Sequence, residues 1–379
     1  MRALVVLALC GCRGILGIHD PVLQADDVGP PSDGSGSETP GDTLPLGCYG
    51  TTGWLLCLGA PPTASIDLSG TLDTDISPLC LAAVPQTWID AGQPDACVVA
   101  GAMITASAEV TVRGTRPLVL LADTKIKFVS TDILELASHR IGGVGPGANA
   151  TACFAGGNGG NSAQGGGGAA GGSFTTPGGD GGDGSGAGGG GSLATVPVPD
   201  LLRGGCPGGR GGSGGAGSAV GGPSGGAVYL VAGGSLSLGG FVNASGAGGS
   251  PGTVGHGGAG GGGSGGMIVM AAPSIDVTGI MLANGGGGGE GSDNNTSGGN
   301  GQDPDLTLPT LPALGGDSGS TSGGDGGAGA ADTIAARNAM NAAAGSSSGG
   351  GGGGGSVGVI RVLTGQQLTG SRISPPPVP

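Results

Sequence analysis

Five short segments of the chain alternate apolar and polar residues, the pattern of a β-strand with one buried face. Most of them end at a glycine, which is typical of a turn. The alternating segments are 64–72 (ASIDLSGTL), 108–114 (AEVTVRG), 124–130 (TKIKFVS), 234–242 (GSLSLGGFV) and 273–281 (PSIDVTGIM). Four other segments are continuously apolar, as in strands that are covered on both sides or lie at a sheet interface. These are 118–122, 228–232, 267–271 and 357–363.

The two kinds of segment recur together. A continuous segment precedes an alternating one three times, and from Ala232 to Ala271 two copies align at a spacing of 39 residues, with one residue of slack before them. A fixed spacing indicates a stacked repeat. We therefore predict an all-β fold, a parallel β-helix (β-solenoid) over residues 48–374, with a proline-rich tail at 375–379. Its inward Ile, Val and Leu side chains would form a column, each contributing about 1.5–3 kcal/mol by burial.

One stretch, 330–345 (AADTIAARNAMNAAAG), has a helical pattern. Asp332 lies near its start and Gly345 beyond its end, as expected at helix termini. We expect one short surface helix there.

Long tracts between the apolar segments consist mostly of glycine, which occupies 98 of the 379 positions. The main tracts are 155–192, 246–266, 285–301 and 345–355. Ordering glycine is entropically costly and buries little surface. Two alternatives stay open: flexible loops, or polyglycine II-like strands that bond laterally through their amides. In either case we expect the tracts to leave the solenoid on one side, as excursions between coils, and any local chemistry to lie on them or on the adjacent sheet.

The charge balance argues against nucleic acid as a partner. The formal net charge is −14, and the only lysines are Lys125 and Lys127. A nucleic-acid surface needs a basic stripe to neutralise phosphates. The scattered acidic residues are more typical of a surface kept soluble by charge.

The first residues have the order of a bacterial lipoprotein signal. Arg2 precedes a short apolar run at 3–9, and Leu9 to Cys12 (LCGC) is similar to a lipobox. Cys12 follows a glycine and fits that motif better than Cys10. We expect a signal peptide at 1–11, a lipid anchor on Cys12 and a disordered tether at 12–47, because this polar segment cannot bury enough surface to fold. The alternative is a leader with free cysteines or a wrongly assigned start codon.

Six further cysteines remain, for which 15 pairings exist. An exported chain favours disulfides over thiols. By proximity in sequence we predict the pairs Cys48–Cys57, Cys80–Cys97 and Cys153–Cys206, the last enclosing the first glycine tract. A metal site is not predicted, because the chain has no CxxC motif and its histidines, His19, His139 and His256, lack ligand spacing.

Several motif matches arise by chance in such a composition. GDSG at 316–319 lacks a histidine in a matching context, and GxSxG at 222–226 and 262–266 lacks the partners of a nucleophile elbow. The segment 178–186 fits a calcium-binding nonapeptide around Asp183, but it is a single copy with Ser185 at the hydrophobic position. The sequence thus predicts no catalytic residue, no metal site and no cofactor.

The chain resembles a group of uncharacterised, glycine-rich surface lipoproteins of myxobacteria. The resemblance rests on CRGILGIHDP, SIDLSG, RPLVLLA, RGGCPGG, GGAVYLVA and GGGGSGGMIVMAAPSIDVTG, and it spans most of the chain beyond residue 12. The short leader departs from the pattern. No activity is established for the group, so the resemblance implies a context and not a mechanism.

We therefore expect a non-enzymatic, exported cell-surface lipoprotein with a structural or adhesive role in the envelope, held in the outer membrane or at the cell surface. Its partners would be the membrane, through the lipid, and extracellular glycans or other surface proteins. The alternatives are a β-helix carbohydrate-active enzyme, a glycan-binding protein or, through a polyglycine surface, an ice-binding protein. For an enzyme, paired carboxylates would be needed. Asp67 and Asp276 occupy equivalent positions of the repeat, where the other copies carry Thr111, Lys127 and Ser237, and they are interpreted as ordinary solvent-facing residues.

Overall fold

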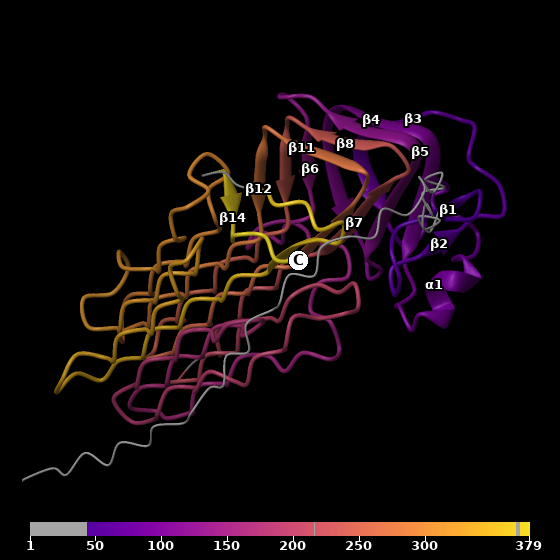
Figure 1. The fold of residues 1–379 in the computed structure, drawn as a ribbon. Coiled ribbons are helices and arrows are strands. Elements are labelled where there is room, and N and C mark those ends of the chain that lie inside the picture. The colour runs from indigo at the N-terminus through magenta and orange to yellow at the C-terminus, as the bar shows by residue number, and fades with distance from the viewer. Residues whose placement is uncertain (1–43, 216, 369–371) are drawn as a thin grey trace, which may run out of the picture. The chain divides into compact units, whose positions relative to one another are not determined.

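Parallel strands in three rows form most of the regular structure of the protein, which is available as a computed structural model (Figure 1). The structure describes residues 44–215, 217–368 and 372–379. The predicted signal peptide, the lipid-anchor residue Cys12 and the tether up to residue 43 lie outside the described residues. The predicted all-β class is confirmed in its coarse form: twelve strands join in one sheet that winds like a solenoid.

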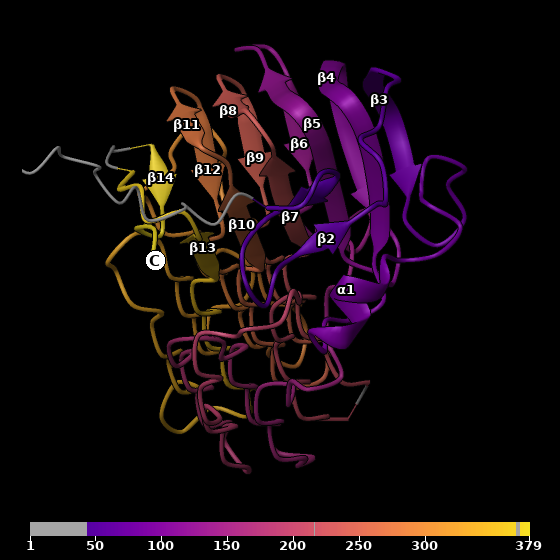
Figure 2. The same ribbon diagram turned by 45° about the vertical axis from the view of Figure 1, so that its right-hand side comes forward.

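Each row stacks parallel strands from successive turns of the chain (Figure 2). The first row contains β4 (Cys97–Arg113), β5 (Leu118–Phe128), β7 (Ala227–Ala232), β10 (Met267–Ala271) and β13 (Val359–Val362). The second contains β3 (Ile66–Asp73), later parts of β4 and β5, β8 (Ser235–Leu238) and β11 (Ser274–Val277). The third contains the ends of β3 and β4, then β6 (Ile133–Glu135), β9 (Phe241–Asn243), β12 (Ile280–Leu282) and β14 (Ile373–Ser374).

The register agrees with the predicted spacing of 39 in the second row, where Ser274 pairs with Ser235. In the first row the spacing is 40 throughout, so Ala271 pairs with Val231 and not, as predicted, with Ala232. The one residue of slack therefore falls between the first and the second row, and not ahead of Ala271.

One predicted equivalence is wrong. Thr111 does not lie beside Asp67 and Asp276, because it pairs with Thr71 and Glu135 in the third row. Thr105 takes the expected place, opposite Asp67. The reason is that β4 runs through all three rows and contains two alternating stretches, which a period of two cannot tell apart.

A single apolar cluster fills the space that the three rows enclose. Each row contributes a stack of buried side chains, spaced by the strand separation of about 4.8 Å. The stack of the first row is Val99, Leu120, Leu230, Met270 and Val362; that of the second is Ile104, Ile126, Leu236 and Ile275; that of the third is Val110, Leu134, Val242, Met281 and Ile373.

The first row is buried on its other face too, which explains why its segments are continuously apolar. Val119, Tyr229 and Val269 belong to a second cluster on this face. Segments that precede β4 in the chain cover it, including β1 (Cys48–Tyr49), β2 (Leu56–Cys57) and α1 (Gln86–Asp90), with the buried Trp88 stacked 5.9 Å from Tyr229. The five-residue helix α1 was not predicted from the sequence.

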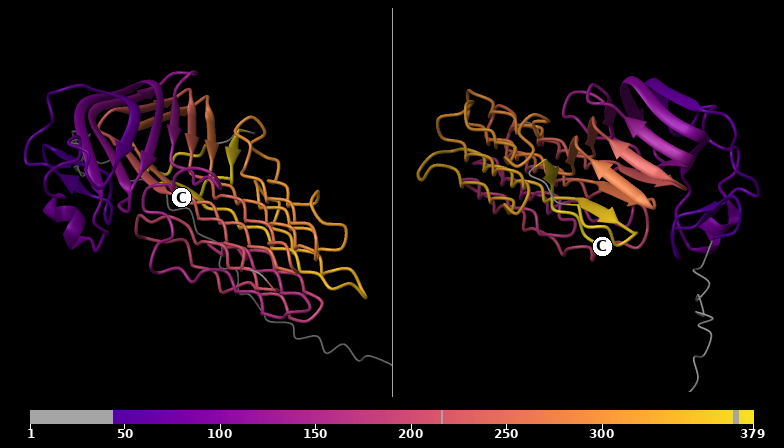
Figure 3. Two further views of the ribbon diagram at one scale, coloured as in Figure 1. Left: turned by 180° about the vertical axis from the view of Figure 1, so that it is seen from behind. Right: turned by 45° about the horizontal axis from the view of Figure 1, so that its top comes forward.

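Three glycine-rich excursions leave the strands on the same side, each after the third row and before the next first-row strand (Figures 1 and 3). We call their described residues within 156–226, 244–266 and 283–358 the glycine bundle. These residues are extended and joined by lateral backbone hydrogen bonds between tracts. In this structure the described parts of the tracts are ordered by these bonds and lie on one side of the strands.

In the glycine bundle the hydrogen-bond partner changes with every residue and returns every third residue. Along 258–266, each backbone N–H donates to a carbonyl of another tract at 2.7–3.2 Å. The acceptors are, in rotation, 206–212, 350–356 and 244–250. Carbonyl groups of 256–264 accept in turn from 166–172, 222–225 and 286–292. This central tract is therefore bonded to six neighbours, and no side chain is needed to hold it.

Backbone contacts this close require glycine. A Cβ added to Gly261 would lie 2.0 Å from the carbonyl oxygen of Ala170, and one added to Gly352 would lie 2.0 Å from that of Gly260. Real Cβ atoms do not approach backbone so closely, and backbone held by hydrogen bonds on several sides cannot retreat.

The predicted helix at 330–345 is wrong. The segment contains only the isolated bridge between Ala331 and Ile334 and otherwise runs extended along the glycine bundle. Arg337 and Met340 donate to the carbonyls of Ala328 and Asp325, at 2.9 Å each. The alanine content of the segment favours a helix, but backbone hydrogen bonds to neighbouring tracts replace the hydrogen bonds within a helix.

Candidate functional site

The two acidic residues considered for catalysis lie far apart. Asp67 and Asp276 are both exposed and occupy the same register position of the second row, at its two ends. Four strand spacings separate them, which corresponds to about 19 Å. Glycosidases place their paired carboxylates within about 5–9.5 Å. This pair therefore does not meet the geometry of such a site, and the Thr105 hydroxyl donates to Asp67 as an ordinary surface contact, at 2.9 Å.

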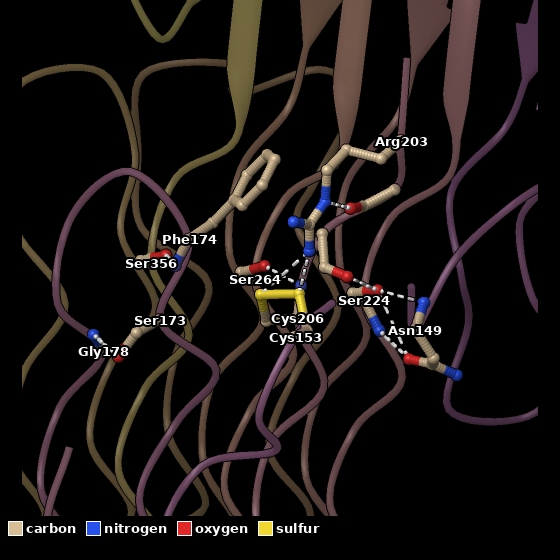
Figure 4. The surroundings of a disulfide bond; sticks show 12 residues. Asn149, Cys153, Ser173, Phe174, Gly178, Arg203, Cys206, Ser224, Ser264 and Ser356 are labelled. Carbon is tan, nitrogen blue, oxygen red and sulfur yellow. Dashed lines mark hydrogen bonds between the residues drawn. A yellow bond between two sulfur atoms is a disulfide. The ribbon is translucent and has the colours of Figure 1, made fainter. Parts of the chain in front are cut away.

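All three predicted disulfides are present. Cys48–Cys57 joins β1 to β2, and Cys80–Cys97 joins the loop ahead of α1 to the start of β4. Cys153–Cys206 links the start of the first large glycine excursion to a later part of it, with the Sγ atoms surrounded by serine and arginine side chains (Figure 4).

The chance motifs have structural roles. The Asp183 carboxylate accepts the N–H of Gly189 at 2.8 Å, and the N–H of Asp183 donates to the side chain of Asn341 at 2.7 Å. The segment around GDSG supplies Gly319, whose N–H donates to the buried carboxylate of Glu290 at 2.7 Å. Both segments are used for backbone bonding within the bundle.

Polar side chains at intervals of three complete the hydrogen bonding at the margins of the glycine bundle. Asn158 and Asn161 accept from the N–H groups of Arg210 and Ser213, at 2.8 Å each. Asn338 plays the same part for Asp180, at 2.8 Å. Unpaired amides at the edge of a layer invite association with other chains. These side chains satisfy such amides and leave a surface of small polar groups.

Glu290 is a fully buried carboxylate inside the glycine bundle. Its oxygens accept the N–H groups of Gly299, Gly319 and Ser320 at 2.6, 2.7 and 2.9 Å. A buried charge is tolerated only when such donors replace its water. Through these hydrogen bonds the Glu290 side chain connects two segments of the last excursion.

A second polar cluster joins the strands to the bundle. His139 Nε2 lies 3.7 Å from Glu135 at the end of β6, and Nδ1 lies 3.4 Å from Asp303 of the last excursion. Asn243 donates to both oxygens of Glu135. The hydrogen bond with Asp303, and after it the one with Glu135, raises the pKa of His139 to about 10. The imidazole is therefore positively charged at neutral pH and holds two carboxylates together.

A cavity of about 760 Å³ lies beside the start of the first excursion. It is bounded by the loop after β4, by 147–151 and by Leu202 and Arg203. Three arginines line it, Arg113, Arg116 and Arg203, against one acidic residue, Asp95. Composition could not reveal this cluster, because Arg203 lies far from the others in sequence.

The segments described include no helix long and apolar enough to cross a membrane. No protein-family model, no curated protein and no solved structure matches the chain.

Proposed function

We propose that this chain is a non-enzymatic, exported surface lipoprotein with a structural or adhesive role in the cell envelope. In this proposal lipid on Cys12 anchors it to the outer membrane or cell surface, and 12–47 is the tether. The folded part is a rigid unit made of a short parallel β-helix and a projecting glycine bundle of the polyglycine II type.

The strand rows support the β-helix part of this proposal. Three rows of parallel strands surround one apolar cluster, and the chain visits the rows in the same order on each turn. The hydrogen bonding supports the polyglycine II part. Such helices have three residues per turn and no internal hydrogen bonds, which accounts for partners that rotate among tracts with a period of three.

The observation that carries the proposal is the saturation of the central tract 258–266 by six neighbouring tracts. A segment bonded in this way is rigid, although glycine has the largest conformational entropy to lose. The outer tracts present short polar groups such as those of Asn158 and Asn338, with little charge. A stiff, polar and weakly charged projection suits repeated weak contacts with glycans or neighbouring cells. The three disulfides support an exported location.

Deletion of the gene, followed by complementation, tests the role. Loss of cell cohesion or envelope integrity on deletion, restored by the wild-type gene, is the expected result. The C12S variant should fail to restore it and should be found in the medium, while incorporation of labelled palmitate should disappear. Unchanged cohesion and envelope integrity in the deletion strain would refute the structural or adhesive role.

The glycan-binding alternative keeps support from the arginine-lined cavity, whereas the enzyme alternative loses the pair that motivated it. A screen of the purified chain on polysaccharides would still decide the latter. Cleavage that is abolished in the D276N variant would overturn the non-enzymatic proposal.

A further inference from the structure

The cavity lined by Arg113, Arg116 and Arg203 brings three positively charged side chains together. Its lining carries three guanidinium groups and one carboxylate, a formal charge of +2, in a chain whose net charge is −14. A cleft with low-dielectric walls and one sign of charge attracts ligands of the opposite sign.

The three arginines differ in the number of carboxylates that lie close to them. Arg116 lies 3.8 Å from both Asp75 and Asp95. For Arg113 and Arg203, no carboxylate lies within 4.0 Å anywhere in 44–215, 217–368 and 372–379. The guanidinium groups of Arg113 and Arg203 can therefore bind an anionic ligand without first breaking an ion pair.

Arg203 is half-buried and has only weak partners (Figure 4). Its guanidinium donates to Cys153 Sγ and, at 3.8 Å, to Cys206 Sγ, while Nε lies 3.4 Å from the carbonyl oxygen of Gly204. Disulfide sulfur is a poor acceptor. The ring of Phe174 lies 5.4 Å below the guanidinium carbon and fixes its plane. A desolvated cation without a counter-charge is costly, and an anion bound beside it would offset that cost.

The side chain of Arg113 packs against Gly143. A Cβ added to Gly143 would come within 2.5 Å of the Nε atom of Arg113. Arg113 ends β4, and Arg116 follows in the next loop, so both are positioned by the strand stack.

Much of the remaining lining is apolar, beside the polar side chains of Thr115, Asn149 and Thr151, and it favours an organic ligand over a purely inorganic one. Pro94, Pro117, Val144 and Leu202 contribute carbon surface to the same cavity. A ligand that fits must combine an anionic head with a body of carbon and oxygen. The volume lies within the range of small-molecule sites and suits one or two sugar rings.

We propose that this cavity binds a sugar carboxylate, such as a uronic acid unit of an acidic polysaccharide. The carboxylate is bound by the guanidinium forks of Arg203 and Arg113, which match its planar geometry, and the ring lies on the proline and leucine side chains. Binding is a property of the folded chain and does not require the lipid anchor or a role in adhesion.

Calorimetric titration of the full-length chain tests this with a matched pair of disaccharides. Cellobiouronic acid and cellobiose differ only by the carboxylate. We expect the acid to bind at least tenfold more tightly and its affinity to fall in 0.5 M salt, because salt screens partly exposed charges. Glucuronate alone should bind more weakly than the disaccharide. This comparison separates a polysaccharide unit from a free sugar acid as the preferred ligand.

Four variants locate the site. R113Q and R203Q should each weaken binding of the acid about tenfold, and R203K should weaken it less, because it keeps the charge but loses the fork. R210Q is the matched control, since Arg210 is exposed at the bundle margin and lies outside the cavity; its affinity should be unchanged. Melting curves identify any variant that fails to fold. R113Q tests the site without a change near the Cys153–Cys206 disulfide, because Arg113 is at an exposed position.

Three results would overturn the proposal. The first is equal binding of cellobiose and the acid, or no heat from either. The second is wild-type affinity in the folded R113Q/R203Q double variant. The third is inorganic phosphate competing as well as the sugar acid, which would indicate a general anion site without recognition of the sugar.

Discussion

The imidazole Nδ1 of His139 lies 3.4 Å from the carboxylate of Asp303, although His139 belongs to the first excursion and Asp303 to the last. Together with Glu135, this pair fastens two excursions to the end of β6. The contact makes the stability of the fold dependent on the protonation of one side chain.

The pH dependence follows from the raised pKa of His139. The folded value of about 10 lies above the ordinary value of 6.5, so the charged imidazole stabilises the fold fully below pH 6.5. This contribution is lost as the pH rises toward 10. Since the side chain is 40% exposed, we expect a loss of about 1 kcal/mol. Urea titrations between pH 6 and 10 measure it. The H139Q variant should lack this slope, while H256N, at the far end of the bundle, should keep it; an identical slope in H139Q would contradict the assignment.

Alanine at the centre of the glycine bundle should be far more damaging than alanine at its surface. The Gly261→Ala Cβ would overlap the carbonyl oxygen of Ala170, whereas the Gly191→Ala Cβ would meet nothing within 4 Å. We expect G261A to cost about 3 kcal/mol or more and G191A less than about 1 kcal/mol. Denaturant unfolding and amide exchange of 258–266 measure the difference. Equal stability of the two variants would mean that the tracts are not packed as described.

Removal of the buried carboxylate of Glu290 should loosen the last excursion. E290A leaves the N–H groups of Gly299, Gly319 and Ser320 without their acceptor, and we expect a loss of about 3 kcal/mol. E290Q keeps the shape but replaces one acceptor by a donor, so an intermediate loss is expected. Amide exchange at these three residues is the measurement. The exposed Glu109 provides the control. An E290A variant as stable as E109A would show that the hydrogen bonds of the Glu290 carboxylate are not needed for stability.

The disulfides should contribute according to the length of chain that they close. Cys153–Cys206 spans 53 residues and Cys48–Cys57 spans 9. The loop-closure model gives about 4 kcal/mol for the first and about 2.5 kcal/mol for the second. Paired serine substitutions followed by thermal unfolding measure both. A larger loss from the shorter loop would show that local packing around the sulfurs outweighs chain entropy.

The strand stack was predictable because the pattern of apolar residues along a strand follows the burial of its two faces. Segments such as 267–271 are apolar throughout since both faces of the first row are covered, and 273–281 alternates since one face meets solvent. The row to which a segment belongs was not predictable in the same way. Thr105 and Thr111 lie in equally good alternating stretches of β4, and only the three-dimensional path separates them.

The segment 330–345 does not form the predicted helix because its pattern has a period of three over most of its length. Beyond Asp332 its half-buried positions are Ala336, Ala339 and Ala342, at intervals of three, while Asn338 and Asn341 bond to a neighbouring tract. A helix would require intervals of three and four. The arginine cavity could not be predicted, since Arg203 reaches Arg113 only through the fold of an excursion that has no sequence periodicity of its own.

The six-fold bonding of 258–266 has a consequence for how the protein is made. Two of its partner tracts, 166–172 and 350–356, lie on opposite sides of it in sequence, and the second is close to the C-terminus. The central tract therefore cannot complete its hydrogen bonding before 350–356 has been synthesised, and such non-local pairing is slow. The glycine excursions should stay open until the last coil is present and then condense together.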